Sequence, residues 1–431
     1  MPDAYMPPAL RFMLAARRIE LEGLEGLSFT CELVASISQL VHALQRERGY
    51  SNLYLGNPSD THRPPLDRLS DEANAIAEDV SARFERMDLD THSATDRARL
   101  FNRIAYVLHG FEALPRLRRR IRERSLSPLE ATAALTRMIG GLLAVVFEAA
   151  DTAVDPSITR ILVALFNFMQ GKELAGQERA TGVAGFSAGF FDAQLLQRLE
   201  QLGHSQDRCF ETFSEFADGT ALGMWKAQQA AEASQQLLKL RAMAARTSAS
   251  ATVDPSLSEL WFDLNTARID AMKAIEEHLA QVLLQACQAS IALARCDLDN
   301  HRLLLKRLAS LDTMGSNDQA KLFNIQANDL STAPSDGLGP HLGRSVLDLL
   351  HAQTQRLVSA NDELETARQA LNERKVVERA KKLLMDEYQL SESEAYAKLR
   401  QSSMERGQRM VEVAQSLLDQ VSAQGAPRHR G

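Results

Sequence analysis

The chain contains little cysteine. Its four cysteines, Cys31, Cys209, Cys287 and Cys296, are dispersed over 431 residues, with no CxxC pair and no spacing typical of a metal site. Disulfide frameworks and structural zinc sites need paired or closely spaced cysteines, so the sequence predicts neither. We expect reduced thiols, as in cytoplasmic proteins.

Long apolar runs are also absent. The longest, MIGGLLAVVF at residues 138–147, is about half as long as the roughly 20 residues that a membrane-spanning helix needs. The N-terminus, MPDAYMPPALRF, lacks the apolar stretch of a signal peptide. We therefore expect a soluble cytoplasmic protein with no membrane contact.

The patterns that mark most enzymes are missing as well. The chain has no glycine-rich phosphate loop, no metal-spaced cluster of His, Cys and Glu, and no nucleophile with a base nearby in the sequence. His42 and His278 lie beside acidic residues, as ordinary structural histidines do. We predict a protein that is not an enzyme and needs no cofactor. The net charge of −7 excludes a general affinity for polyanions, so any nucleic-acid surface must be local.

Aromatic residues make up only 6% of the chain, whereas alanine, leucine, glutamine, glutamate and arginine are abundant. Apolar residues recur at helical spacing nearly everywhere, which predicts an all-α fold. Short breaks interrupt this pattern, as between antiparallel helices. They fall at 56–65, 125–128, 153–157, 185–191 and 247–256. The region before residue 331 should therefore form a large N-terminal unit of packed helical bundles.

A different composition follows that region. The segment STAPSDGLGPHLG at 331–343 is dense in Pro, Gly and Ser, which predicts an interdomain linker over 331–345. Leucines then recur every seven residues, which predicts a connecting helix over 346–371. This helix leads into a small C-terminal three-helix domain, and pairing across a homodimer is one arrangement that suits it.

Three arginines occupy unexpected positions on the predicted helices. In LQRERGYS, Arg48 lies on the same face as Val41, whereas Arg46 points to the opposite side. Arg179, in GKELAGQERATG, and Arg268, in WFDLNTARID, also share a face with apolar residues. Charged side chains are rarely buried without a partner, so each of the three needs one.

Two explanations are open for these arginines. Each can form a buried ion pair with a carboxylate near in sequence, such as Glu47, Glu178 or Asp270. Alternatively, the three guanidinium groups converge on a small anion, because a guanidinium is planar, permanently charged and offers a fork of donors that fits a planar oxyanion.

The segments LVHALQRERGYSNLYLG, GKELAGQERATG and WFDLNTARID resemble the signature segments of the NIT domain, a nitrate- and nitrite-sensing module of bacterial receptors and regulators. The similarity extends over residues 31–310. It implies two packed helical bundles that bind nitrate or nitrite between arginines. Carried over by motif, Arg48, Arg179 and Arg268 are the expected ligand residues. Arg46 is a secondary candidate, because the helix turns it outward.

Residues 361–422 predict three short helices. Ser391 and Glu394 match a capping box at the start of the second helix, and Gly407 separates it from the third. Basic residues crowd the first two helices, namely Arg374, Lys375, Arg379, Lys381, Lys382, Lys398 and Arg400. Such a cluster is either a solvated face or a local surface for a polyanion.

The order RKVVERAKKLLM, EAYAKLR and then VA closely resembles the ANTAR domain, an RNA-binding antitermination module. The resemblance implies that RNA recognition or its support falls to Ala380, Lys381, Met385, Tyr396 and Arg400. We add the neighbouring basic residues Arg379, Lys382 and Lys398 to this predicted RNA surface. Tyr396 can stack on an unpaired base, or it can pack in the core. Lys382 departs from the family pattern, which usually has a small residue there.

A NIT sensor joined to an ANTAR domain resembles the nitrate-responsive transcription antiterminators. This resemblance implies that anion binding frees the C-terminal domain to bind hairpins of a leader mRNA, so that no terminator forms ahead of nitrate assimilation genes. Two alternatives are open. The protein can sense another small anion with the same RNA output, or it can be a DNA-binding regulator.

Overall fold

A computed structural model describes residues 8–57, 59–87, 94–153, 155–312, 373, 376–388, 390 and 392–424. Apart from an isolated bridge between Ser248 and Ala251, these residues contain no β-structure, which confirms the predicted all-α fold. The predicted linker at 331–345 and connecting helix at 346–371 lie outside the described residues, as do Arg374, Lys375 and Ser391.

The helices of the N-terminal region begin and end close to the predicted breaks. They are α1 (Pro8–Gly56), the short 3-10 helix η1 (Asp60–His62), α2 (Arg63–Glu85), α3 (Ala94–Arg122), α4 (Pro128–Thr152), α5 (Pro156–Ser187), α6 (Ala193–Phe216), α7 (Gly219–Ala230), α8 (Glu232–Ala244) and α9 (Leu257–Asp312). The break between α2 and α3 and the breaks on either side of α7 were not predicted; only two residues separate α7 from α6 and one separates it from α8.

Side-chain caps explain several of the helix starts. Ser127 accepts a hydrogen bond from the Glu130 amide and Glu130 bonds back to Ser127, a complete capping box before α4. At the start of α5, the side chain of Asp155 accepts hydrogen bonds from the amides of Ser157 and Ile158. Each of these helices also has proline at its first position, where no amide hydrogen is needed.

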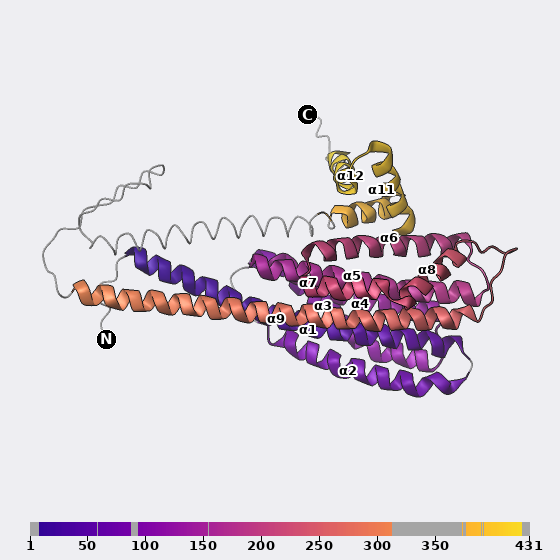
Figure 1. Cartoon of the computed structure of the whole chain (residues 1–431), viewed down its shortest axis with the longest axis horizontal. Coiled ribbons are helices and arrows are strands. Elements are labelled where there is room, and N and C mark those ends of the chain that lie inside the picture. Colours follow the sequence, from indigo (N-terminus) through magenta and orange to yellow (C-terminus); the bar gives the residue numbers. More distant parts are fainter. Residues whose placement is uncertain are drawn as a thin grey trace, which may run out of the picture. The chain divides into compact units, whose positions relative to one another are not determined.

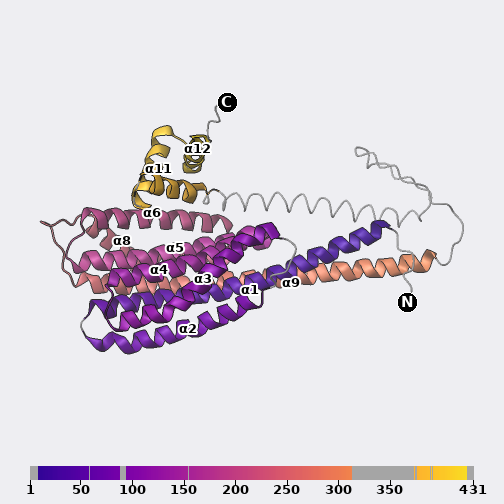
Figure 2. The same cartoon turned by 180° about the vertical axis from the view of Figure 1, so that it is seen from behind.

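The chain divides into two compact units. One comprises residues 1–29 and 285–366, and the other comprises residues 30–284 and 367–431. Within the second unit, helices of the N-terminal region run alongside one another (Figures 1 and 2). The central helix α5 packs against α4 and α6, and most of its side chains are buried.

The C-terminal region of the second unit is also helical. Residues 376–388 are followed by α11 (Glu392–Arg406) and α12 (Met410–Gln424). A small core forms from Ala380, Leu384, Ala395, Leu399 and Ala414. Gly407, between the last two helices, has a φ of +59°, which glycine adopts more easily than other residues.

Three helices are long and apolar enough to cross a membrane by length and composition alone. They contain the segments Leu14–Gly56, Pro128–Asp151 and Leu257–Asn300. The prediction from sequence rested on uninterrupted apolar runs, and the longest of these, at residues 138–147, covers less than half of the segment Pro128–Asp151. Two of them carry fully buried charges, Arg48 and Glu276, that pair with other helices of the bundle. The absence of membrane contact stays a prediction.

Candidate functional site

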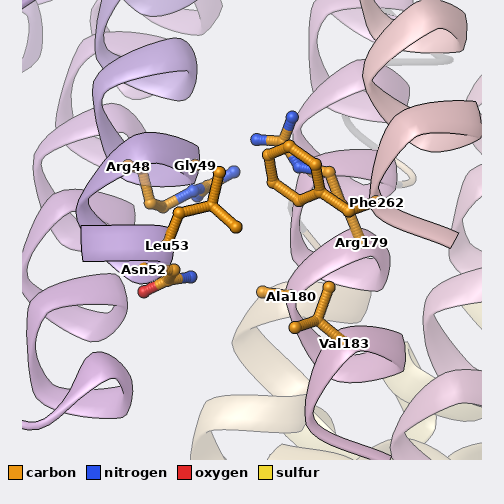
Figure 3. Close-up of a pocket in the computed structure, with 9 residues that line it drawn as sticks. Arg48, Gly49, Asn52, Leu53, Arg179, Ala180, Val183 and Phe262 are labelled. Atoms are coloured by element: carbon orange, nitrogen blue, oxygen red, sulfur yellow. The ribbon is translucent and has the colours of Figure 1, made fainter. Parts of the chain in front are cut away.

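A small cavity of about 40 Å³ lies between α1, α5 and α9. A single buried water needs roughly 10–15 Å³, so this cavity has room for an ion of a few atoms. No acidic side chain lines it, and the two arginines that do point toward one another (Figure 3). The lining residues are Arg48, Gly49, Asn52, Leu53, Gly176, Arg179, Ala180, Val183 and Phe262.

Arg48 comes from α1, and only 1% of its surface is exposed. Its Nη1 and Nη2 atoms donate to the two carboxylate oxygens of Glu173, on α5, at 2.5 and 3.1 Å. Nη1 also donates to the hydroxyl of Thr136 at 2.8 Å. Nε makes no hydrogen bond to a described residue. One edge of the guanidinium is therefore occupied by protein, and the edge with Nε is available to a ligand.

Arg179 comes from α5 and is 5% exposed. It donates to the Thr266 hydroxyl at 2.8 Å and to the main-chain oxygen of Gln45 at 3.2 Å, and it lies 4.9 Å from the centre of the Phe262 ring. Among the described residues it has no carboxylate partner. Burial, together with the positive charge of Arg48, lowers the pKa of Arg179 to about 10. The side chain still carries its charge at neutral pH, and no carboxylate of the described part of the chain forms an ion pair with it.

Two glycines make room for these side chains. A Cβ atom on Gly176 would clash with Nη2 of Arg48, and a Cβ atom on Gly49 would clash with Nη2 of Arg179. The guanidinium group of Arg48, on α1, therefore packs against Gly176 of α5, and that of Arg179, on α5, packs against Gly49 of α1. A larger residue at either glycine would displace a guanidinium group from its present position at the cavity.

The structure does not bring Arg268 to this cavity. Its guanidinium lies 3.5 Å from Glu178, whose carboxylate also accepts two hydrogen bonds from Arg241 at 2.5 and 2.7 Å. The periodicity of α9 placed Arg268 on the buried face, but Asn265 and Ile269 occupy that face and Arg268 lies at its edge.

Arg46 faces outward, as the periodicity predicted, and lies 3.3 Å from the exposed Glu72. The ion-pair explanation and the anion-site explanation thus apply to different arginines. Arg268 forms an ion pair with Glu178, one of the carboxylates suggested for this role. Arg48 and Arg179 instead meet at a cavity.

Sequence reasoning missed the remaining side chains around the two arginines. Glu173 lies in the same motif as Arg179, which was a usable signal. Gln45 and Phe262 also lie in quoted motifs, whereas Thr136 gave no signal, because its role depends on which helices pack together. Glu47, proposed as a partner for a nearby arginine, pairs instead with Arg118 of α3 at 2.7 and 2.9 Å.

The predicted RNA surface separates into exposed and buried positions. Arg379, Lys382 and Lys398 are exposed. Ala380 is fully buried in the small C-terminal core, and Met385 packs against that core. The latter two positions therefore support the helix rather than face a ligand.

The other predicted RNA residues are partly buried. Lys381 forms an ion pair with Glu378 at 2.8 Å, and Arg400 is half-buried. Tyr396 is also half-buried, and the guanidinium of Arg208, on α6, lies 4.6 Å from the centre of its ring.

The described residues contain no cluster of three or more His, Cys, Asp or Glu side chains that could hold a metal ion. No disulfide bond joins the described cysteines. The absence of a cofactor stays a prediction.

Comparison with known proteins gives consistent matches. Residues 39–284 match the family described as "Nitrate and nitrite sensing" (NIT), and residues 365–418 match the ANTAR domain. The chain is 31% identical over 414 residues to a nitrate regulatory protein of Klebsiella oxytoca, covering 96% of this chain and 95% of that protein. The solved structure of the NasR transcription antiterminator aligns with a TM-score of 0.59 and 29% identity, over 97% of this chain and 100% of that one.

Proposed function

Because this chain belongs to the family of nitrate-sensing antitermination regulators that combine a NIT and an ANTAR domain, we propose that its ligand, nitrate or nitrite, binds in the cavity between α1, α5 and α9. The protein is a nitrate-responsive regulator of transcription antitermination, not an enzyme. What remains to be assigned is the residues that bind the anion and the RNA.

The observation that carries the assignment of the cavity is the state of Arg179. A guanidinium that is 5% exposed, without a carboxylate partner among the described residues, lines a cavity of about 40 Å³. Burying an unpaired charge is unfavourable, so the site favours a small anion that completes it. Nitrate and nitrite are planar oxyanions, and they can accept hydrogen bonds from Nε and Nη of Arg48 and Arg179 together. Arg268 and Arg46 lie away from this cavity, and we propose no direct ligand contact for them.

For the RNA, we propose that Arg379, Lys382 and Lys398 contact the backbone of the leader hairpins. Their exposure and charge support this role. The contact between Arg208, on α6, and Tyr396 supports masking of Tyr396 by the sensor. In this proposal, anion binding shifts the packing of the sensor helices and releases the RNA surface. A homodimer joined through the predicted helix at 346–371 is an alternative route for the signal.

The ligand assignment is tested by calorimetric titration of the full chain with nitrate, nitrite, chloride and formate. We expect nitrate or nitrite to bind about tenfold more tightly than chloride, because a spherical ion cannot accept paired hydrogen bonds from both guanidinium groups, and each charge-assisted bond contributes about 1.5–3 kcal/mol. Equal affinity for chloride would indicate a general anion site. Tighter binding of formate would favour a sensor of carboxylates.

A further inference from the structure

Glu173 is the carboxylate that forms an ion pair with Arg48 beside the proposed anion site, although it does not line the cavity. It is 2% exposed, and its two oxygens accept four hydrogen bonds. Two come from Arg48, one from Gln45 at 2.9 Å and one from Gln177 at 3.0 Å. The carboxylate is thus fully hydrogen-bonded by side chains of the protein itself.

The other buried glutamates of the bundle are paired with other cations. Glu47 pairs with Arg118, Glu178 with Arg241, and Glu276 with Lys172. Among the described residues, Glu173 alone forms an ion pair with either arginine of the cavity. The two guanidinium groups carry +2 and Glu173 carries −1, so these three groups have a net charge of +1; Asp270 also attracts Arg179 but forms no ion pair with it among the described contacts.

We propose that Glu173 is an internal counter-ion of the sensor, which sets the affinity of the pocket by opposing the negative charge of the ligand. This inference rests on the proposed function of the cavity. A carboxylate and nitrate are both planar oxyanions, so Glu173 presents to one edge of Arg48 the chemistry that nitrate presents to the other. Its charge stabilises two adjacent buried cations in the empty protein, and it repels an anion that enters.

Gln45 connects this carboxylate to the second arginine. Its side-chain amide donates to Glu173, and its main-chain oxygen accepts from Arg179 at 3.2 Å. Glu173 therefore contacts Arg48 directly and is linked to Arg179 through Gln45, so its charge acts on both cations of the site. A residue that only positioned Arg48 would strengthen ligand binding, whereas an internal counter-ion weakens it. The two roles predict opposite effects of a neutral substitute.

The test is Glu173→Gln in the full chain, with nitrate binding measured by calorimetry and stability by thermal unfolding. Glutamine keeps the shape but removes the charge, so the net charge rises from +1 to +2. We expect the variant to bind nitrate about tenfold more tightly, since charges a few ångströms apart interact strongly inside a protein. It should also melt at a lower temperature without nitrate and recover when nitrate is added.

Glu47→Gln is the matched control, because Glu47 is equally buried and forms the same kind of pair with Arg118, but Arg118, unlike Arg48, does not line the cavity. It should bind nitrate as the wild type does. Glu173→Asp, which keeps the charge, should stay close to the wild-type affinity, and it provides the comparison if Glu173→Gln does not fold. In that case, a Glu173→Asp variant that loses nitrate binding would overturn the inference, because only geometry has changed.

Two failures are distinguishable. If the wild type binds nitrate and Glu173→Gln binds it equally or more weakly, the counter-ion role is wrong and the pocket assignment stands. If neither the wild type nor the variant binds nitrate or nitrite, the assigned function of the cavity is wrong, and the inference fails with it.

Discussion

Replacing Arg179 with alanine should abolish nitrate binding and leave the protein folded. Loss of a buried charge-assisted contact typically costs about 2–5 kcal/mol, which is a decrease in affinity of about 30-fold or more. Because Arg179 has no carboxylate partner among the described residues and lies near Arg48, its removal leaves no unpaired acid and relieves a repulsion. We therefore expect the variant to melt no lower than the ligand-free wild type.

Arg48→Ala should differ from Arg179→Ala in one measurable respect. It should also abolish nitrate binding, but it leaves the buried Glu173 without its cation, so it should lower the melting temperature as well. Arg46→Ala is the control, because Arg46 is exposed and pairs only with the exposed Glu72. Binding of nitrate by Arg179→Ala with wild-type affinity would contradict the pocket assignment.

Nitrate binding by Arg268→Ala should distinguish the site expected from the family resemblance from the site seen in the structure. The resemblance places Arg268 among the ligand residues, whereas the structure places it beside Glu178 and outside the cavity. Retained nitrate binding would support the cavity as described here. Its loss in a variant that is still folded would extend the site to Arg268.

The largest effect on stability should come from Glu276→Ala. Glu276 and Lys172 are fully buried and form an ion pair, and Lys273 lies 3.3 Å from the same carboxylate. Removing the carboxylate leaves two cations in the interior, which typically costs about 3–5 kcal/mol. Urea unfolding at neutral pH measures this loss, and Glu277→Ala on the exposed neighbour should change little. A loss as small as that of Glu277→Ala would contradict this account of the core.

The same carboxylate predicts a pH dependence. Although burial acts to raise it, the attraction of Lys172 and Lys273 lowers the pKa of Glu276 from 4.5 to about 2. The unfolded chain therefore takes up a proton at a higher pH than the folded chain does. The stabilisation is fully present above pH 4.5 and is lost progressively as the pH falls toward 2. The Glu276→Ala variant should lack this part of the acid dependence.

Much of the fold follows from local sequence. Helical periodicity and capping residues such as Ser127 and Asp155 act over a few positions, so the helices and most of their breaks could be predicted. The burial of Arg48 and Arg179 followed from the same periodicity and from their motifs.

The pairing of side chains could not be predicted in the same way. Arg48 and Glu173 are 125 positions apart, and Glu47 and Arg118 are 71 apart. These pairs depend on which helices pack together and on how far the helices are offset along their axes. For the same reason periodicity could not place Arg268, since a side chain at the edge of a helix face turns toward whichever neighbour supplies a partner. Here that neighbour is Glu178, which is also bound to Arg241 of α8.

The central claim is that an anion bound at Arg48 and Arg179 controls RNA binding by the C-terminal domain. The most direct measurement is the affinity of the full chain for a leader RNA hairpin with and without nitrate, for the wild type and for Arg179→Ala. We expect nitrate to tighten RNA binding by the wild type about tenfold or more and to have no effect on the variant. By thermodynamic reciprocity, the RNA should tighten nitrate binding by the same factor. Equal RNA affinity of the wild type with and without nitrate, or a nitrate response preserved in Arg179→Ala, would contradict the account.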